Sequence, residues 1–258
     1  MNIKSIFSKI IKHILKYEKY NPIIYIGNEK ELDNWIYEID KSKRLIYLIK
    51  FINLNTTKAV IYGAYKKGNK TYRTKLRKCQ NMFIGRYNLN SIEFKPGIDC
   101  SNLINMGRMF YACDNLTSII GLENLDTSNV TDMAGMFTFC KSLTSFNLSS
   151  FNTSNVIDMS CMFDGCETLT SLDLTSFDTS KVTDMSYMFS CCELLTELDL
   201  ISFNTSNVTD MNRMFMSCIS LCKLDLSSFN NSKLITNNDM FYACPNLDMT
   251  TISKAWYK

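Results

Sequence analysis

A phrase of about 26 residues recurs from about residue 100 onward, and no other property of the sequence restricts the fold so strongly. The copies align on a methionine, and the sixth has an asparagine in its place: Met106, Met133, Met159, Met185, Met211 and Asn237. Successive copies are 27, 26, 26, 26 and 26 residues apart. A unit of this length cannot bury its own apolar side, whereas stacked units bury a continuous core. The period therefore predicts a solenoid in which each copy forms one coil.

Inside each copy the spacing of the apolar residues changes halfway. Steps of three and four residues, typical of one face of a short helix, separate Val130, Met133, Met136, Phe137 and Cys140. The spacing of a short strand and its exit turn follows at Leu143, Phe146, Leu148 and Phe151. We therefore expect an α/β solenoid with a parallel sheet, whose strands lie about 4.8 Å apart, and with short helices on the opposite side.

Two polar columns fit the beginning of these expected helices. Serine is well placed as the N-cap at Ser128, Ser154, Ser180 and Ser206. Aspartate follows in the first turn, where the helix dipole favours a carboxylate, at Asp132, Asp158, Asp184 and Asp210. We interpret both columns as structural, with a ligand-binding role as the alternative.

Charge divides the chain into two parts. Residues 1–78 carry 18 Lys and Arg against 6 Asp and Glu, a net charge of +12, whereas residues 79–258 carry 10 against 19, a net charge of −9. We predict a basic N-terminal region over 1–78 and the repeat solenoid over 79–258. The solenoid would have a degenerate cap from residue 79, repeats from residue 106 and a C-terminal cap over 237–258.

The basic region has the pattern of a small mixed α/β unit preceded by an amphipathic helix. Apolar residues between 3 and 15 fall on one side of that helix and lysines on the other. Such a helix can lie on an anionic membrane surface, or it can cover a core or the end of a solenoid. The stretches "NPIIYIG" and "KAVIYGAY" are predicted as strands, with a helix beginning near residue 28 between them.

Eleven cysteines invite a disulfide or metal interpretation. Six occupy one repeat position: Cys113, Cys140, Cys166, Cys192, Cys218 and Cys244. We expect a buried ladder of free thiols, with a disulfide between adjacent rungs or a zinc site as alternatives. His13 is the only histidine and no glycine-rich phosphate loop occurs, so an enzyme, a cofactor or a small-molecule substrate is not expected.

The phrase "LxxLxLxxF[DN]TSxVTDMSxMFxxC", as it stands at Leu169 to Cys192, resembles the repeat of bacterial BspA-like leucine-rich-repeat surface proteins. The resemblance covers roughly residues 100 to 247 and implies a leucine-rich-repeat-like solenoid. It also implies adhesion or binding of host or matrix proteins at the cell surface, and it brings no catalytic residues. Residues 1–78 take no part in it.

The outward face of the predicted sheet is the candidate binding surface. One column, between the inward leucines, contains Asn147, Asp173, Asp199 and Asp225, and Glu197 and Lys223 lie beside it. Three carboxylates about 4.8 Å apart would favour a cationic partner, a metal ion or a raised pKa. The alternative is a solvated column that binds nothing.

The run at 66–78 places seven positive charges in thirteen residues. It could hold an anionic surface, or it could be a solvated hinge that faces the acidic solenoid. The sequence therefore leaves two hypotheses: a non-enzymatic module for protein or glycan recognition, such as an adhesin, or an intracellular scaffold that the basic region targets to a membrane or nucleic acid. The resemblance implies the cell surface, and the lack of a signal-peptide pattern favours the cytoplasm.

Overall fold

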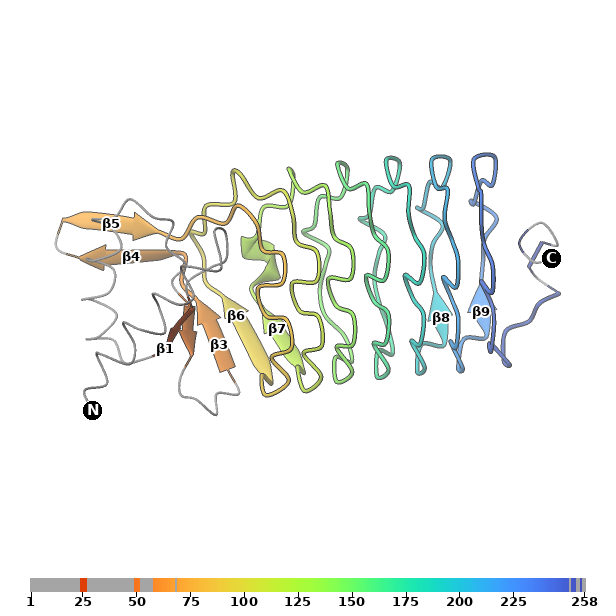
Figure 1. Cartoon of the computed structure of the whole chain (residues 1–258), viewed down its shortest axis with the longest axis horizontal. Helices are drawn as coiled ribbons and strands as arrows, with labels where there is room; N and C mark the ends of the chain where they lie inside the picture. The colour runs from red at the N-terminus through yellow and green to blue at the C-terminus, as the bar shows by residue number, and fades with distance from the viewer. Residues whose placement is uncertain are drawn as a thin grey trace.

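The computed structural model describes residues 24–26, 49–51, 58–67, 69–250, 252–253 and 256. It shows an elongated stack of coils that runs from the N-terminal strands to the C-terminal end (Figure 1). The predicted solenoid is therefore present. The amphipathic helix expected near the N-terminus and the helix expected from residue 28 lie outside the described residues. Within the described part, no helix is long and apolar enough to cross a bilayer.

A five-stranded sheet joins the N-terminal region to the first coils. Its order is β1 (Ile24–Ile26), β2 (Ile49–Phe51), β3 (Lys58–Ile61), β6 (Ser91–Phe94) and β7 (Ser118–Ile120). The pairs are parallel except for the antiparallel β2 and β3. The strands predicted at the two apolar stretches of the basic region are confirmed. Because β3 pairs with β6, the basic region and the cap coil share one sheet.

The predicted parallel sheet of the solenoid is interrupted. After β7, regular strands return only at β8 (Glu197–Leu198) and β9 (Lys223–Leu224), which pair in parallel. The corresponding residues of the coils between them, 144–148 and 170–174, form no named strand. A separate hairpin, β4 (Ala64–Lys67) and β5 (Lys70–Arg73), projects at the N-terminal end (Figure 1). The connection between coils must therefore depend mainly on another part of each repeat.

That connection lies where short helices were predicted, and the prediction of helices is wrong. Within the described residues up to 250, the only helix is the 3-10 helix η1 (Leu122–Asn124). Each repeat has a series of tight turns instead, which we call the turn segment and which runs from the aligned methionine to the ladder cysteine. The turn segments are residues 106–113, 133–140, 159–166, 185–192, 211–218 and 237–244, with residues 79–86 as the equivalent in the cap.

Backbone hydrogen bonds of two kinds alternate along each turn segment. The Met136 N–H donates to the Met133 carbonyl of its own coil at 3.2 Å, whereas the Phe137 N–H donates to the Met162 carbonyl of the next coil at 2.9 Å. Four bonds of the second kind cross every junction from the cap to the last repeat. Because every N–H of this series except those of the last coil has a partner, the backbone can be buried without a helix.

The turns place two residues of each segment in the left-handed region, although most of these residues are not glycine. Examples are Arg108 (φ 52), Phe139 (φ 57) and Tyr187 (φ 57). Gly165 has φ 68 and also accommodates a neighbour, since a Cβ there would lie 2.3 Å from Cδ1 of the Phe139 ring. A non-glycine residue at positive φ is strained, so the inter-coil bonds must stabilise this conformation.

The core consists of columns of identical side chains. Seven phenylalanines stack along the turn segments, with centroids 5.3 to 5.8 Å apart: Phe83, Phe110, Phe137, Phe163, Phe189, Phe215 and Phe241. Trp256 covers the C-terminal end, where its ring meets Phe229 edge-on at 5.8 Å. The ladder cysteines are free thiols, fully buried except for the half-buried Cys244. Their predicted burial is confirmed for five of the six.

A buried column of threonines connects the coils outside the turn segments. The Thr179 hydroxyl donates to the Asn204 carbonyl at 3.1 Å and accepts the Asn204 N–H at 2.8 Å. The same two bonds connect Thr127, Thr153 and Thr205 to the coil that follows each of them. Each hydroxyl thus satisfies both backbone groups of one residue in the next coil.

Candidate binding surfaces

The strand-face column lies on the surface, as the sequence predicted. We define the strand face as Asn147, Asp173, Asp199 and Asp225 with Glu197 and Lys223, and all six are exposed. In each of the four column residues, Oδ1 accepts the backbone N–H two residues further on, at 2.8 to 3.0 Å. The column therefore also has a structural task, because it closes the turn that ends the strand segment.

These hydrogen bonds affect the ionisation of two aspartates of the column. The Thr175 hydroxyl and N–H lower the pKa of Asp173, and the N–H and hydroxyl of Ser227 lower the pKa of Asp225. Hydrogen bonds to the ionised form favour ionisation. The raised pKa that the sequence allowed is therefore wrong for these two residues, and both carboxylates are ionised at neutral pH.

One carboxylate of the strand face has a cationic neighbour. The Lys223 ammonium lies 3.5 Å from Glu197 across the paired strands β8 and β9. Both side chains are more than two thirds exposed, so the pair contributes little to stability. No group of three or more metal-ligating side chains occurs among the described residues. The face is thus an acidic surface with a single local compensation by lysine.

The two polar columns expected at helix starts have other partners. The Ser180 N–H donates to Oδ1 of Asp178 at 2.9 Å, so this serine is a donor to its neighbour and the N-cap assignment is wrong. Asp184 accepts the N–H of Ser186 at 2.8 Å and its hydroxyl at 2.7 Å. The aspartate column is half-buried and supports the first turn of each segment. Its structural interpretation holds, although there is no helix dipole to explain it.

A second surface was missed in the sequence. Within residues 79–250, every arginine and tyrosine lies in a turn segment or directly beside one: Arg86, Tyr87, Arg108, Tyr111, Tyr187, Arg213 and Tyr242. We call this surface the turn edge. Arginine and tyrosine are enriched at protein–protein hot spots. Their restriction to one part of the repeat was visible in the sequence and is the signal that could have indicated this surface.

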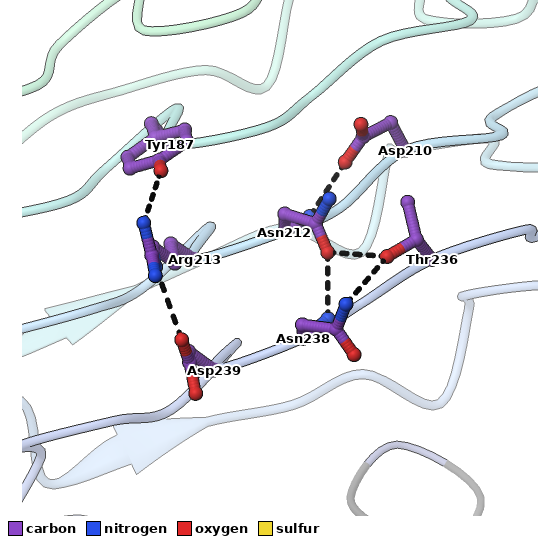
Figure 2. A network of polar contacts seen from close by, with 7 residues as sticks. All are labelled: Tyr187, Asp210, Asn212, Arg213, Thr236, Asn238 and Asp239. Carbon is purple, nitrogen blue, oxygen red and sulfur yellow. Dashed lines mark hydrogen bonds and ion pairs between the residues drawn. The ribbon is translucent and has the colours of Figure 1, made fainter.

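Three residues of consecutive coils are connected across the turn edge (Figure 2). Arg213 Nη1 donates to the Tyr187 hydroxyl at 2.6 Å, and its Nε donates to Oδ2 of Asp239 at 3.1 Å. The guanidinium carbon also lies 5.6 Å from the centroid of the Tyr187 ring. These contacts hold the arginine in one orientation, which reduces the entropy that binding would cost.

A second group of hydrogen bonds lies beside these contacts and has a structural role. Oδ1 of Asn212 accepts the Thr236 hydroxyl at 2.5 Å and the Asn238 N–H at 2.7 Å (Figure 2). The Asn212 N–H in turn donates to Oδ1 of Asp210 at 2.8 Å. Thr236 occupies the position at which earlier coils have an aspartate that accepts the N–H two residues further on. In this coil Asn212 accepts that N–H instead.

Most of the chain matches one protein family. The family described as "Mycoplasma protein of unknown function, DUF285" matches residues 77–172 and 168–256, more than half of the chain. The chain belongs to the DUF285 family. No curated protein matches it significantly.

Three solved structures are similar to this DUF285 chain. A leucine-rich-repeat protein from T. pallidum is 15% identical, with a TM-score of 0.45 over 68% of this chain and 77% of that chain. A leucine-rich cell surface protein from Faecalibacterium prausnitzii is 15% identical, with a TM-score of 0.20 over 74% and 83%. A leucine-rich-repeat protein from Bacteroides ovatus is 14% identical, with a TM-score of 0.19 over 74% and 76%.

The basic run at 66–78 lies where the DUF285 repeats begin. It includes the end of β4, the strand β5 and the entry to the cap coil. Lys75, Arg77 and Lys78 are exposed, and the Lys75 ammonium lies 3.6 Å from Asp99. Its described residues therefore form a strand of the hairpin and the first residues that pair with a coil of the DUF285 solenoid. They do not form the hinge that was considered from the sequence.

Proposed function

We propose that the protein is a non-enzymatic binding module that recognises a cationic protein partner through its strand face. The observation that carries this proposal is the alignment of Asp173, Asp199 and Asp225 in successive coils, each exposed and each held by a turn hydrogen bond. Because this column is separate from the buried columns, its side chains can vary without disturbing the core.

Preorganisation supports a binding role for this column. One oxygen of each carboxylate is occupied by a backbone N–H, so the carboxylate is oriented before any partner arrives. Less side-chain freedom is then lost on binding. A row of fixed negative charges also accelerates association with a positively charged partner, and this effect declines as the salt concentration rises.

The resemblance of the repeat phrase to BspA-like surface proteins supports adhesion at the cell surface as the setting of this function. Glycan recognition by the same face is the nearest alternative within this class. An intracellular scaffold that the basic run targets to an anionic surface is a second candidate, and the exposure of Lys75, Arg77 and Lys78 favours it. The two functions predict opposite charges for the partner.

The sequence of the strand face itself indicates which substitution tests this proposal. Asn147 occupies the same column and accepts the Ser149 N–H at 2.8 Å, so asparagine preserves the turn without the charge. We therefore expect Asp173→Asn, Asp199→Asn and Asp225→Asn together to leave the fold intact. The triple variant should lose at least tenfold in affinity for immobilised cationic polypeptides, measured by biolayer interferometry at two salt concentrations.

The control variant changes the other surface. Tyr187→Ala removes an aromatic side chain of the turn edge and leaves the strand-face charges in place. If the triple variant binds as well as the unmodified protein, whereas Tyr187→Ala binds less, the partner docks on the turn edge and the strand-face proposal is wrong. Binding to anionic vesicles or RNA without binding to the cationic panel would favour the basic run.

A further inference from the structure

The last rung of the cysteine ladder differs from the others in its surroundings. Cys218 is fully buried, with a further rung on each side of it along the stack. Cys244 belongs to the terminal turn segment and is only half-buried. The N–H groups of Phe241 and Ala243 in the same segment donate to no carbonyl among the described residues. Cys244 is therefore the ladder thiol that a dissolved reagent can reach.

The two final thiols occupy the same position in adjacent coils. Cys244 donates to the Phe215 carbonyl at 2.8 Å, and Cys218 lies 3.1 Å from the Phe189 carbonyl. The single proton of the Cys218 thiol can be donated either to that carbonyl or to the Cys244 sulfur. Neighbouring coils lie about 4.8 Å apart, which falls within the Cα separation of about 4.4 to 6.8 Å that a disulfide needs.

The proximity of the two thiols also affects their ionisation. The hydrogen bond from Cys218 lowers the pKa of Cys244, although partial burial acts in the opposite direction. Burial raises the pKa of the interior thiol Cys113 to about 12. Since the thiolate is the reactive form, Cys244 should react earlier than the interior rungs at neutral pH.

We propose that Cys244 and Cys218 are an oxidisable pair that forms a disulfide when the protein meets a hydroperoxide. The Cys244 thiolate attacks one peroxide oxygen, the O–O bond breaks, and the products are a sulfenic acid and, after protonation, water or an alcohol. The Cys218 sulfur then attacks the Cys244 sulfur, its proton passes to the departing hydroxyl, and one molecule of water leaves. Two thiols are oxidised and one hydroperoxide is reduced.

The disulfide would connect the terminal coil covalently to the coil before it. Among the described residues, this coil receives four backbone bonds from its predecessor, but its own Phe241 and Ala243 N–H groups make none beyond it, so it should open more easily than the interior coils. Oxidation would therefore increase the resistance of the C-terminal end to local opening and to proteolysis.

The test uses the full reduced chain, hydrogen peroxide and non-reducing peptide mass spectrometry. We expect a peptide pair linked through Cys218 and Cys244 in most molecules, before any interior rung is modified. Cys244→Ser should abolish this link, whereas the interior control Cys166→Ser should leave its yield within twofold. Oxidation confined to the exposed Cys222, or a link that Cys166→Ser reduces as much as Cys244→Ser does, would overturn the proposal.

A second measurement on the unmodified protein does not depend on whether a variant folds. Iodoacetamide labelling across pH should modify Cys244 at least tenfold faster than Cys218 and Cys192 at pH 7. Peroxide treatment before labelling should protect Cys244, and a reductant should restore its labelling. Labelling of Cys244 at the same rate as the buried rungs, or without protection by peroxide, contradicts the proposal.

Discussion

Replacing Thr179 with valine removes one hydroxyl and almost no volume, so it isolates the polar contribution of the threonine column. Thr179 is fully buried, and its hydroxyl makes two hydrogen bonds to the backbone of Asn204. Valine leaves that N–H and that carbonyl without partners. Each unsatisfied buried group costs about 1 to 3 kcal/mol. Because Asn204 is exposed as a residue and water can reach part of its backbone, we expect a loss of about 2 to 4 kcal/mol.

Serine at the same position is the matched control. Thr179→Ser keeps the hydroxyl and both hydrogen bonds and removes one buried methyl group, which should cost about 1 kcal/mol. Urea denaturation followed by circular dichroism gives the free energy of unfolding of the three proteins. Valine should be the more damaging substitution. A valine variant at least as stable as the serine variant would show that packing of the methyl group, and not the pair of hydrogen bonds, holds these coils together.

Three further predictions concern other columns. Gly165→Ala should cost about 2 to 4 kcal/mol of unfolding free energy, since alanine would have positive φ and would also collide with the Phe139 ring of the preceding coil. In the control Gly85→Ala, φ is 66 but no atom lies within 4 Å, so the cost should be only about 1 kcal/mol. In thiol titration of the native protein, Cys166 should stay unreactive until denaturant is added, and early reactivity would contradict its burial. Cys166→Ser should cost about 1 kcal/mol of unfolding free energy, because a serine hydroxyl can donate to the same carbonyl as the thiol. The lowered pKa values of Asp173 and Asp225 imply stability that is present above the ordinary carboxyl pKa of about 4 and is lost as the pH falls through the lower folded values. Acid unfolding of the triple asparagine variant should therefore be less steep between about pH 4 and 2, and an unchanged profile would show that these carboxylates do not contribute.

The period and the columns of the core could be predicted from the sequence alone. Repetition at 26 residues places Cys140 beside Cys166 and Phe137 beside Phe163 whatever the backbone does within a coil, because equivalent residues of stacked units are neighbours. The same argument placed the carboxylates of the strand face in successive coils. It requires only the register, which needs no knowledge of hydrogen bonds.

The candidate surfaces were predicted unevenly for a related reason. The strand face follows from the register, but the turn hydrogen bonds that lower the pKa of Asp173 depend on the local path of the chain after the strand. The turn edge was readable as a restriction of arginine and tyrosine to one segment. The hydrogen bond between Tyr187 and Arg213 could not be predicted, since it depends on the conformation of both side chains relative to the next coil.

The backbone of the turn segment was decided only by the tertiary structure. Val130, Met133 and Met136 have the spacing of a helix, yet a chain of tight turns buries residues at the same steps of three and four. What separates the two conformations is the partner of every second N–H, which lies one coil away instead of within the segment. Residues such as Phe139 and Tyr187 have no intrinsic preference for positive φ, so the local sequence does not predict the turns. The bonds that stabilise this conformation exist only after the coils have stacked, and the sequence of a single repeat therefore determines which residues are buried but not which backbone buries them.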